Sequence, residues 1–345
     1  MRKVIFGVVA TLAVAFCANA ASAGEAVTKT NRFTSVHADG IVDHSLVLSG
    51  FDLSRAKPMP TPTINAPVAP GIENAILKTA QGREESGANL ANTGNPAVAP
   101  LKWVGLVVSA LDKTHWGLCT GEFIAPRVVL TAGHCVHQEG SNNWLDVNNM
   151  VFVLQFQNGG GSHVYKAVCA ATLNAYSYPN NFAQLPVDQQ NAAMANAGQH
   201  DYAMILVDSD SLTGSINYMT DWKGQYVGAT RVGYPGDVLG GKVIQEAHGI
   251  VFFADAIPMF MDSNHNQISY PGLVVHWQNN TKLTQGSSGG AWVANASSEE
   301  SKDTNLVISV TSFNNTAFPG AIMGPYFVGA EFQSLLKYTQ GGCKA

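Results

Sequence analysis

Thr284-Gln285-Gly286-Ser287-Ser288-Gly289-Gly290 leads directly into the apolar run Ala291-Trp292-Val293. Glycines on both sides of Ser288 permit a sharp backbone turn and the close approach of another chain to the amide groups. A nucleophilic serine needs such a setting, because N–H groups must point at the oxyanion that forms during attack. The segment also fits the Gly-x-Ser-x-Gly turn of α/β-hydrolases and an ordinary turn between strands. The rest of the chain has to separate these interpretations.

The composition is that of a globular protein with a large core. The chain has 345 residues, of which 46% are hydrophobic and 12% are charged. This length allows one large domain or two smaller ones. The formal net charge is -5 and the sequence contains no basic block, so nothing indicates nucleic-acid binding.

The N-terminus has the features of a secretory signal peptide. A positively charged start precedes an apolar run at residues 4–16 and the small-residue exit Ala21-Ser22-Ala23. This pattern predicts cleavage after Ala23, with Ala20 as the alternative. We therefore assign residues 1–23 to a signal peptide. We expect a secreted or periplasmic protein without membrane insertion once the signal is removed.

The cysteines indicate disulfide bonds. The sequence contains 5 cysteines, and Cys17 falls inside the expected signal peptide. An even number of the remaining cysteines in an exported chain is typical of disulfide pairing. Counting alone leaves three pairings open among Cys119, Cys135, Cys169 and Cys343.

Residues 24–96 differ from the sequence that follows them. Five prolines between residues 58 and 70 favour an extended, poorly packed chain. Residues 80–96 are rich in Gly, Asn, Ala and charge, which is typical of linkers that proteases cut. We interpret residues 24–96 as a propeptide or a flexible N-terminal extension, with a tail of no function as the alternative.

Residues 97–345 have the pattern of an all-β protein. Short runs rich in Val, Ile, Phe and Tyr alternate with Gly, Asn and Pro, which indicates a barrel or a sandwich. Residues 329–338 predict a closing helix, and residues 174–200 predict a long surface insertion with a short helix. The expected strands are at residues 103–108, 123–124, 127–131, 151–156, 202–207, 226–233, 242–253, 273–277, 291–294 and 306–312.

A histidine and an aspartate complete a candidate triad with Ser288. His134 follows the apolar run at residues 127–131, and a neutral histidine is well suited to accept a proton near pH 7. Asp201 begins another apolar run, where its carboxylate can orient an imidazole. The last histidine of the chain is His276, so none follows Ser288. This order excludes an α/β-hydrolase, in which the histidine comes after the serine.

Three ordered blocks resemble the triad motifs of trypsin-like serine proteases of the chymotrypsin fold. Val232-Gly233-Tyr234-Pro235-Gly236 is similar to the bacterial branch that includes glutamyl endopeptidases. The likeness covers roughly residues 97–345, and three ordered motifs are far more specific than any one of them. The blocks are Thr131-Ala132-Gly133-His134-Cys135, His200-Asp201-Tyr202-Ala203 and Gly286-Ser287-Ser288-Gly289-Gly290.

The resemblance implies a fold and a set of catalytic roles. It implies two six-stranded antiparallel β-barrels, at about residues 97–215 and 216–345, with the triad in the cleft between them and a C-terminal helix. Ser288 would be the nucleophile, His134 the base and Asp201 the residue that orients it. The backbone N–H groups of Gly286 and Ser288 would form the oxyanion hole.

The resemblance also bears on the disulfides and on activation. It implies that Cys119 pairs with Cys135. Cys169 and Cys343 remain, and the resemblance does not require a bond between them. Ser287 occupies a position where animal trypsins carry an aspartate that pairs with a newly cut N-terminal amine. That ion pair cannot form here, so any control of activation must work differently. Our hypothesis is that removal of the N-terminal extension unblocks the cleft.

The substrate side chain is less well determined than the triad. The family's substrate-pairing strand matches Ser312, Phe313 and Asn314. Lys282 stands six positions before the nucleophile, where trypsin carries an aspartate. A lysine there favours acidic substrate side chains or simply points to solvent, and both interpretations stay open.

The sequence therefore predicts a secreted serine endopeptidase that acts on protein or peptide substrates through an acyl-enzyme. Two alternatives remain, namely an inactive binding module with a protease fold and a secreted esterase with the same triad. We expect no cofactor, no metal site and no nucleic-acid partner, and we expect a monomer.

Overall fold

The computed structural model describes residues 32–38, 56–65, 92–111, 115–138, 140–158, 160–224, 227–253, 260–261, 267–268, 272–277, 285–316 and 320–344. The expected signal peptide, residues 1–23, lies outside these ranges, and so does Lys282. Within these ranges, none of the helices has both the length and the apolar character that crossing a membrane requires.

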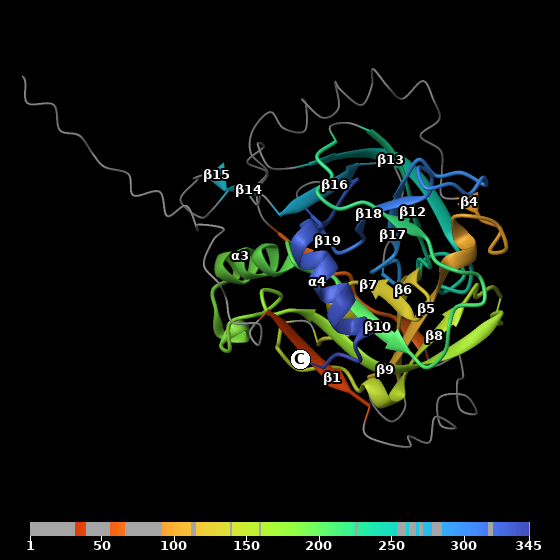
Figure 1. Ribbon diagram of the computed structural model, residues 1–345. Coiled ribbons are helices and arrows are strands. Elements are labelled where there is room, and N and C mark those ends of the chain that lie inside the picture. The colour runs from red at the N-terminus through yellow and green to blue at the C-terminus, as the bar shows by residue number, and fades with distance from the viewer. Residues whose placement is uncertain are drawn as a thin grey trace, which may run out of the picture.

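The first structural unit is a closed barrel of six antiparallel strands, which occupies the lower half of Figure 1. Its strands follow the order β9-β10-β7-β6-β5-β8, and a further pairing between β8 and β9 closes the ring. They are β5 (Val104–Ala110), β6 (Trp116–Ala125), β7 (Val128–Thr131), β8 (Met150–Leu154), β9 (His163–Leu173) and β10 (Ala203–Val207).

The barrel strands bury side chains on both faces. Successive side chains on a strand point to opposite sides, so Phe123 and Ile124 of β6 belong to different apolar clusters. Phe123 packs edge-on against Phe152 and Tyr165, with ring centroids 5.1 Å and 4.9 Å apart. Ile124 belongs to the cluster that also contains Val293 of the second unit. This continuous apolar packing joins the two units.

The second unit is a curved antiparallel sheet in the upper half of Figure 1. Six of its strands follow the order β18-β17-β12-β13-β16-β20. The end strands β18 and β20 are linked, because Ser309 Oγ donates to the Pro325 carbonyl at 2.9 Å. Ser312 N, just beyond β18, donates to the Met323 carbonyl at 3.1 Å. These strands are β12 (Val227–Gly233), β13 (Gln245–Phe253), β16 (Leu273–Trp277), β17 (Ala291–Ala294), β18 (Leu306–Val310) and β20 (Ala321–Pro325).

Shorter elements extend this sheet or lie beside it. β11 (Asn217–Tyr218) adds to β18, and β19 (Phe313–Asn315) adds to β20. A small separate ribbon pairs β14 (Phe260–Met261) with β15 (Gln267–Ile268). Short 3-10 helices lie at η2 (Leu101–Trp103), η3 (Gly133–Cys135), η4 (Val147–Asn149) and η5 (Phe182–Gln184).

Two α-helices of the described residues complete the fold. α4 (Gly329–Gln340) closes the chain and buries Phe332, Leu335 and Leu336. The predicted all-β fold with a C-terminal helix is therefore confirmed, with the first barrel closed by strand pairing and the second unit formed by a curved sheet. α3 (Val187–Gly198) lies in the segment predicted as a surface insertion.

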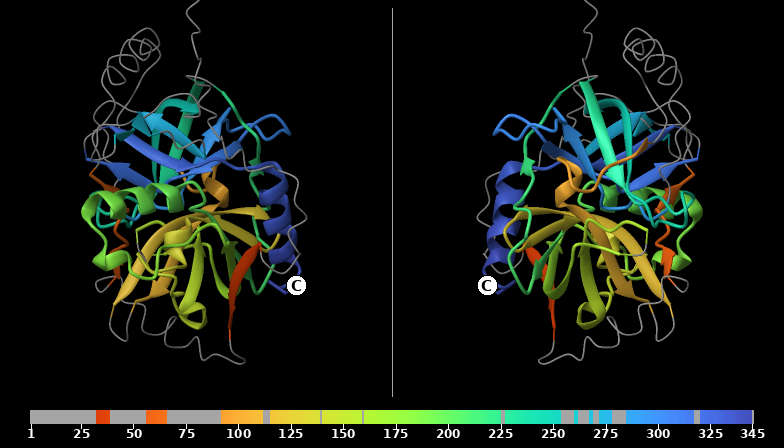
Figure 2. Two further views of the ribbon diagram at one scale, coloured as in Figure 1. Left: turned by 90° about the vertical axis from the view of Figure 1, so that its left-hand side faces the viewer. Right: turned by 90° about the vertical axis from the view of Figure 1, so that its right-hand side faces the viewer.

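Parts of residues 24–96 pair with both units. β1 (Phe33–His37) adds antiparallel to β9, and β4 (Asn92–Thr93) adds antiparallel to β13. β2 (Ala56–Pro58) pairs parallel with β6, and β3 (Thr63–Ile64) pairs parallel with β19. In Figure 2 the orange-red strands lie against the lower barrel and the upper sheet.

Two disulfides link cysteines within the described part of the chain. Cys119 of β6 bonds to Cys135, which follows His134, as the resemblance implies. Cys169 of β9 bonds to Cys343 at the end of the chain, a pairing that the sequence left open. The second bond ties the C-terminal tail to the first barrel.

Candidate active site

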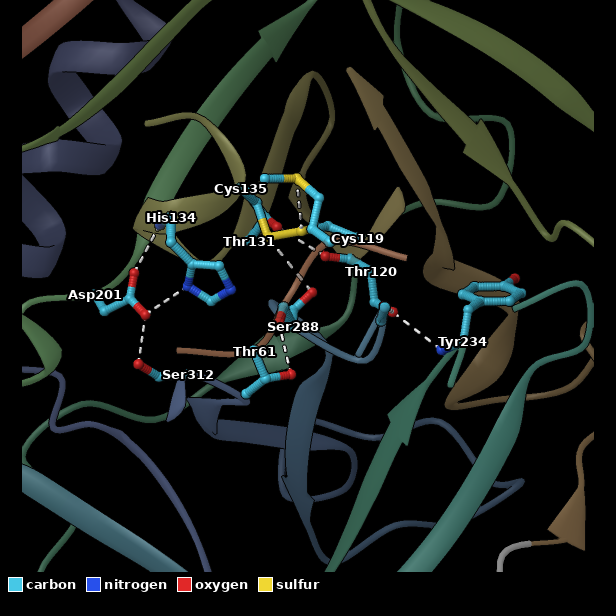
Figure 3. Close-up of a disulfide and its surroundings, with 12 residues drawn as sticks. Thr61, Cys119, Thr120, Thr131, His134, Cys135, Asp201, Tyr234, Ser288 and Ser312 are labelled. Atoms are coloured by element: carbon cyan, nitrogen blue, oxygen red, sulfur yellow. Dashed lines mark hydrogen bonds and ion pairs between the residues drawn. A yellow bond between two sulfur atoms is a disulfide. The ribbon is translucent and has the colours of Figure 1, made fainter. Parts of the chain in front are cut away.

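The histidine of the predicted triad lies in a short helical turn directly after β7. His134 belongs to η3 and is 1% exposed. Its backbone N–H donates to Asp201 Oδ1 at 2.8 Å, and its ring Nδ1 lies 2.8 Å from Asp201 Oδ2. This double contact fixes both the backbone and the ring of His134. Figure 3 shows the other ring nitrogen on the side that faces Ser288.

Asp201 sits just before β10 and is held by groups from both units. Ser312, which precedes β19, donates its hydroxyl to the same Oδ2 that contacts His134. Burial alone raises the pKa of the Asp201 carboxyl, but the interactions with His134 and Ser312 outweigh it and lower the pKa below its ordinary value. The carboxylate therefore stays ionised at neutral pH, where it holds the proton of His134 on Nδ1.

Ser288 lies on a tight turn that requires glycine. Gly286 has a φ of +91°, and a Cβ there would lie 2.5 Å from the Tyr234 carbonyl oxygen. Gly289 has a φ of +82°, and a Cβ there would lie 2.2 Å from Thr131 Oγ1. Other residues rarely adopt this backbone conformation. The glycines therefore allow the Ser288 turn to lie close against the first barrel.

Thr120 of β6 holds the same turn from the first barrel, a role that the sequence motifs do not reveal. Its hydroxyl donates to the Gly286 carbonyl at 2.8 Å and accepts from Tyr234 N at 3.0 Å. Its backbone N–H donates to the Ser288 carbonyl at 2.8 Å. Thr120 thus connects the unit that carries His134 to the turn that carries Ser288 (Figure 3).

The predicted oxyanion donor Gly286 faces a backbone carbonyl. Its N–H donates to the Met59 carbonyl oxygen at 3.3 Å. The Ser288 amide lies two residues further along the same turn. Gly286 N is therefore occupied by a backbone carbonyl oxygen of residues 56–65.

The remaining predicted substrate residues lie on or beside β19. Asn314 N donates to the Pro62 carbonyl at 3.0 Å, so this strand does bind an extended chain. Phe313 is buried, and a Cβ on Gly198 at the end of α3 would lie 2.2 Å from its ring. Ser312 directs its hydroxyl to Asp201. The fourth predicted substrate residue, Lys282, lies outside the described ranges.

One cluster of metal-ligand residue types adjoins the triad. Cys119, His134 and Cys135 place a ligand atom each within 4.8 Å of one another. The two sulfurs are bonded to each other, so neither supplies a thiolate. This cluster is therefore a disulfide beside His134.

Comparison with known proteins is informative at the level of structure. No protein-family model matches the sequence, and no curated protein matches it either. The solved structure of the protease Anisep from Arthrobacter nicotinovorans is 19% identical, with a TM-score of 0.51, and the match covers 74% of this chain and 100% of that one. The chain has the chymotrypsin fold.

A second structure of the chymotrypsin fold gives the same result. A Glu endopeptidase in complex with MPD is 18% identical, with a TM-score of 0.51. The match covers 73% of this chain and 96% of that chain. Both structural neighbours are proteases by name, and the likeness shows the fold of this chain.

Proposed function

We propose that this protein is an exported serine endopeptidase that hydrolyses peptide bonds through an acyl-enzyme. Ser288 Oγ attacks the substrate carbonyl while His134 Nε2 takes its proton, and Asp201 holds the resulting imidazolium. The N–H groups of Gly286 and Ser288 hold the oxyanion. His134 then protonates the leaving amine, and water repeats these steps on the ester of Ser288.

The carboxylate–imidazole pair beside the Ser288 turn is the observation that carries this proposal. His134 Nδ1 lies 2.8 Å from Asp201 Oδ2, and the pKa of Asp201 is lowered, so a charged orienting group is available at neutral pH. The order of the three residues along the chain and the fold of the neighbouring structures support the same assignment.

Export is part of the proposal. The two disulfides fit an oxidising compartment, and the N-terminal pattern supports a signal peptide at residues 1–23. We also propose that residues 24–96 form the propeptide or extension and that residues 97–345 form the protease domain. We propose a monomer that acts on protein or peptide substrates.

Peptide-bond cleavage by the processed protein tests this function. The wild type and the variants Ser288→Ala and His134→Ala are incubated with an unfolded protein, and the fragments are identified by mass spectrometry. Ser287→Ala is the matched control, because its buried hydroxyl has no hydrogen-bond partner among the described residues. We expect fragments from the wild type and Ser287→Ala, and a loss of at least about 1000-fold in Ser288→Ala and His134→Ala.

Each alternative function has its own result. Turnover of a small ester without any peptide fragments would identify an esterase. A folded, fully processed wild type that cleaves neither substrate would indicate a binding module. Undiminished fragmentation by Ser288→Ala would contradict the triad assignment.

A further inference from the structure

Residues 56–65, which we call the cleft segment, run from one unit to the other. The segment begins as β2, with Ala56, Lys57 and Pro58 opposite Trp116, Gly117 and Leu118 of β6. It ends as β3, with Thr63 and Ile64 opposite Asn314 and Asn315 of β19. Figure 2 shows these orange-red strands beside the lower barrel and the upper sheet. The segment therefore crosses the cleft that holds the triad.

The middle of the cleft segment covers the catalytic serine. The Thr61 hydroxyl lies 3.5 Å from Ser288 Oγ (Figure 3), and Gly286 N donates to the Met59 carbonyl at 3.3 Å. Ser288 is 0% exposed and Thr61 is 7% exposed. A nucleophile that attacks an external substrate must be reachable, so this arrangement cannot turn over substrate until the cleft segment moves.

The end of the cleft segment is held by a side chain on α3. Asn191 Oδ1 accepts from Asn65 N at 3.2 Å, and Asn191 Nδ2 donates to the Asn65 carbonyl at 3.1 Å. This pair of bonds recognises a peptide backbone and not a particular side chain. Ile64, one residue earlier, is 1% exposed. Together, Ile64 and Asn65 form the anchor of the segment beyond β19.

We propose that the cleft segment is an intramolecular inhibitor that occupies the substrate groove and the oxyanion donor. This inference rests on the proposed protease function. The occupant is extended and is bound mainly through its backbone, which is the way that peptide ligands add to an exposed strand. The same groove, including Asn191, would bind the backbone of a substrate after the segment has left.

The direction of the cleft segment explains how it escapes cleavage. Its residue order carries it from β6 to β19, and it runs parallel to both of these strands. A substrate that adds antiparallel to β19 would run the opposite way. When a chain runs in the opposite direction, the carbonyl carbon and the amide nitrogen of each peptide bond exchange places relative to Ser288 and His134. The leaving nitrogen of the segment is then misplaced for protonation by His134.

The residue before the nucleophile is consistent with this kind of control. Ser287 offers no carboxylate to pair with a newly formed amino terminus. Opening the cleft therefore depends on the departure of the segment itself. Proteolysis on either side of the segment weakens its hold, because a detached segment loses the benefit of being part of the same chain.

Ester hydrolysis by the uncut chain tests the inhibition. Ile64→Asp places a carboxylate at a buried anchor, whereas the control Lys57→Asp places it at an exposed position of the same segment. We expect Ile64→Asp to hydrolyse a small ester about tenfold faster than the wild type or more, with Lys57→Asp close to the wild type. If Ile64→Asp fails to fold, Ile64→Ala replaces it, and we expect this variant also to hydrolyse the ester faster than the wild type.

The processed wild type separates the two ways in which this test can fail. If the processed chain is active and all uncut chains are equally active, the inhibition proposal is wrong and the protease assignment stands. If the processed chain hydrolyses neither ester nor peptide, the protease assignment itself is wrong.

A synthetic peptide of residues 56–65 gives an independent measurement. Added to the processed enzyme, it should inhibit peptide hydrolysis competitively and be recovered intact by mass. The same peptide with Ile64→Asp should inhibit about tenfold less strongly or weaker still. Rapid cleavage of the peptide between residues 59 and 62, or the absence of any inhibition, would overturn the proposal.

Discussion

The first barrel and the second sheet contribute different parts of the candidate site. The first barrel is a closed ring that supplies His134 and Asp201, and both disulfides of the described chain involve its strands. The second sheet supplies Ser288 and β19, and its end strands are joined by individual hydrogen bonds. In the proposed mechanism, the first barrel, which both disulfides tie, therefore carries the residues for proton transfer. The second sheet carries the nucleophile and the strand that binds substrate.

Asp201→Asn tests the chemical part of this comparison and should have the largest effect. An amide in place of the carboxylate fails to hold the Nδ1 proton of His134, so kcat should fall by about 10,000-fold. Asp208, at the far end of β10, accepts a bond from Lys166 N and is exposed, which makes Asp208→Asn a matched control. Equal losses in both variants would mean that Asp201 acts only through folding.

The disulfides test the structural part of the comparison. Cys169 and Cys343 are separated by 174 residues and Cys119 and Cys135 by 16. In the chain-entropy model their removal lowers the free energy of unfolding by roughly 5 and 3 kcal/mol. Denaturant unfolding of the two double Cys→Ser variants measures this. A larger loss for the short loop would show that local packing around His134, and not loop closure, dominates.

A buried histidine makes the first barrel sensitive to acid. His137 is buried against Trp144, with ring centroids 3.9 Å apart, and burial lowers the pKa of His137 to about 4, although nearby Asp201 opposes this. The unfolded chain takes up this proton near pH 6.5, so stability is complete above that pH and is lost as pH falls toward 4. The loss is at most about 3 kcal/mol.

His137→Phe keeps an aromatic ring and removes the titration. The difference in unfolding free energy between wild type and variant should therefore change with pH between 4 and 6.5 and stay constant above it. Urea unfolding at several pH values measures this. A difference that does not vary with pH would contradict the assigned cause.

Ser312→Ala should have the smallest effect, because it removes one of several bonds to Asp201. Its hydroxyl reaches from the second sheet to the carboxylate of the first barrel. Loss of a hydrogen bond to a charged group should lower kcat by about tenfold and raise the pKa of Asp201. Without this donor the Asp201 carboxylate holds a protonated His134 more tightly, so the acid limb of the pH profile, where His134 can no longer accept a proton, should move to higher pH. An unchanged pH profile would show that Ser312 has no part in positioning Asp201.

The sequence was most informative where chemistry demands particular residues at particular positions. The glycines around Ser288 and the apolar runs beside His134 and Asp201 each predict a local structure, and the His–Asp–Ser order excludes the rival fold. The helix predicted at residues 329–338 agrees with α4, which ends at Gln340. Such local patterns can be recognised in the sequence because the backbone conformation and the burial of the strands restrict which residues can occupy these positions.

The contacts of Thr61, Asn191 and Thr120 could not be predicted in the same way. Thr61 meets Ser288 across 227 positions of sequence, and Asn65 meets Asn191 across 126. These contacts use hydroxyl and backbone groups that any polar segment offers, so they leave no motif. The prolines predicted an extended, poorly packed chain. Residues 56–58 and 63–64 are extended, but the expectation of poor packing is wrong for Met59, Thr61 and Ile64, which are buried.

Labelling with a fluorophosphonate, followed by intact-mass measurement, tests the central claim most directly. We predict one adduct on Ser288 in the processed wild type and none in Ser288→Ala or His134→Ala, because the serine needs its base to react. An unlabelled processed wild type would contradict the claim that this cleft holds an activated nucleophile, as would an adduct that persists in Ser288→Ala.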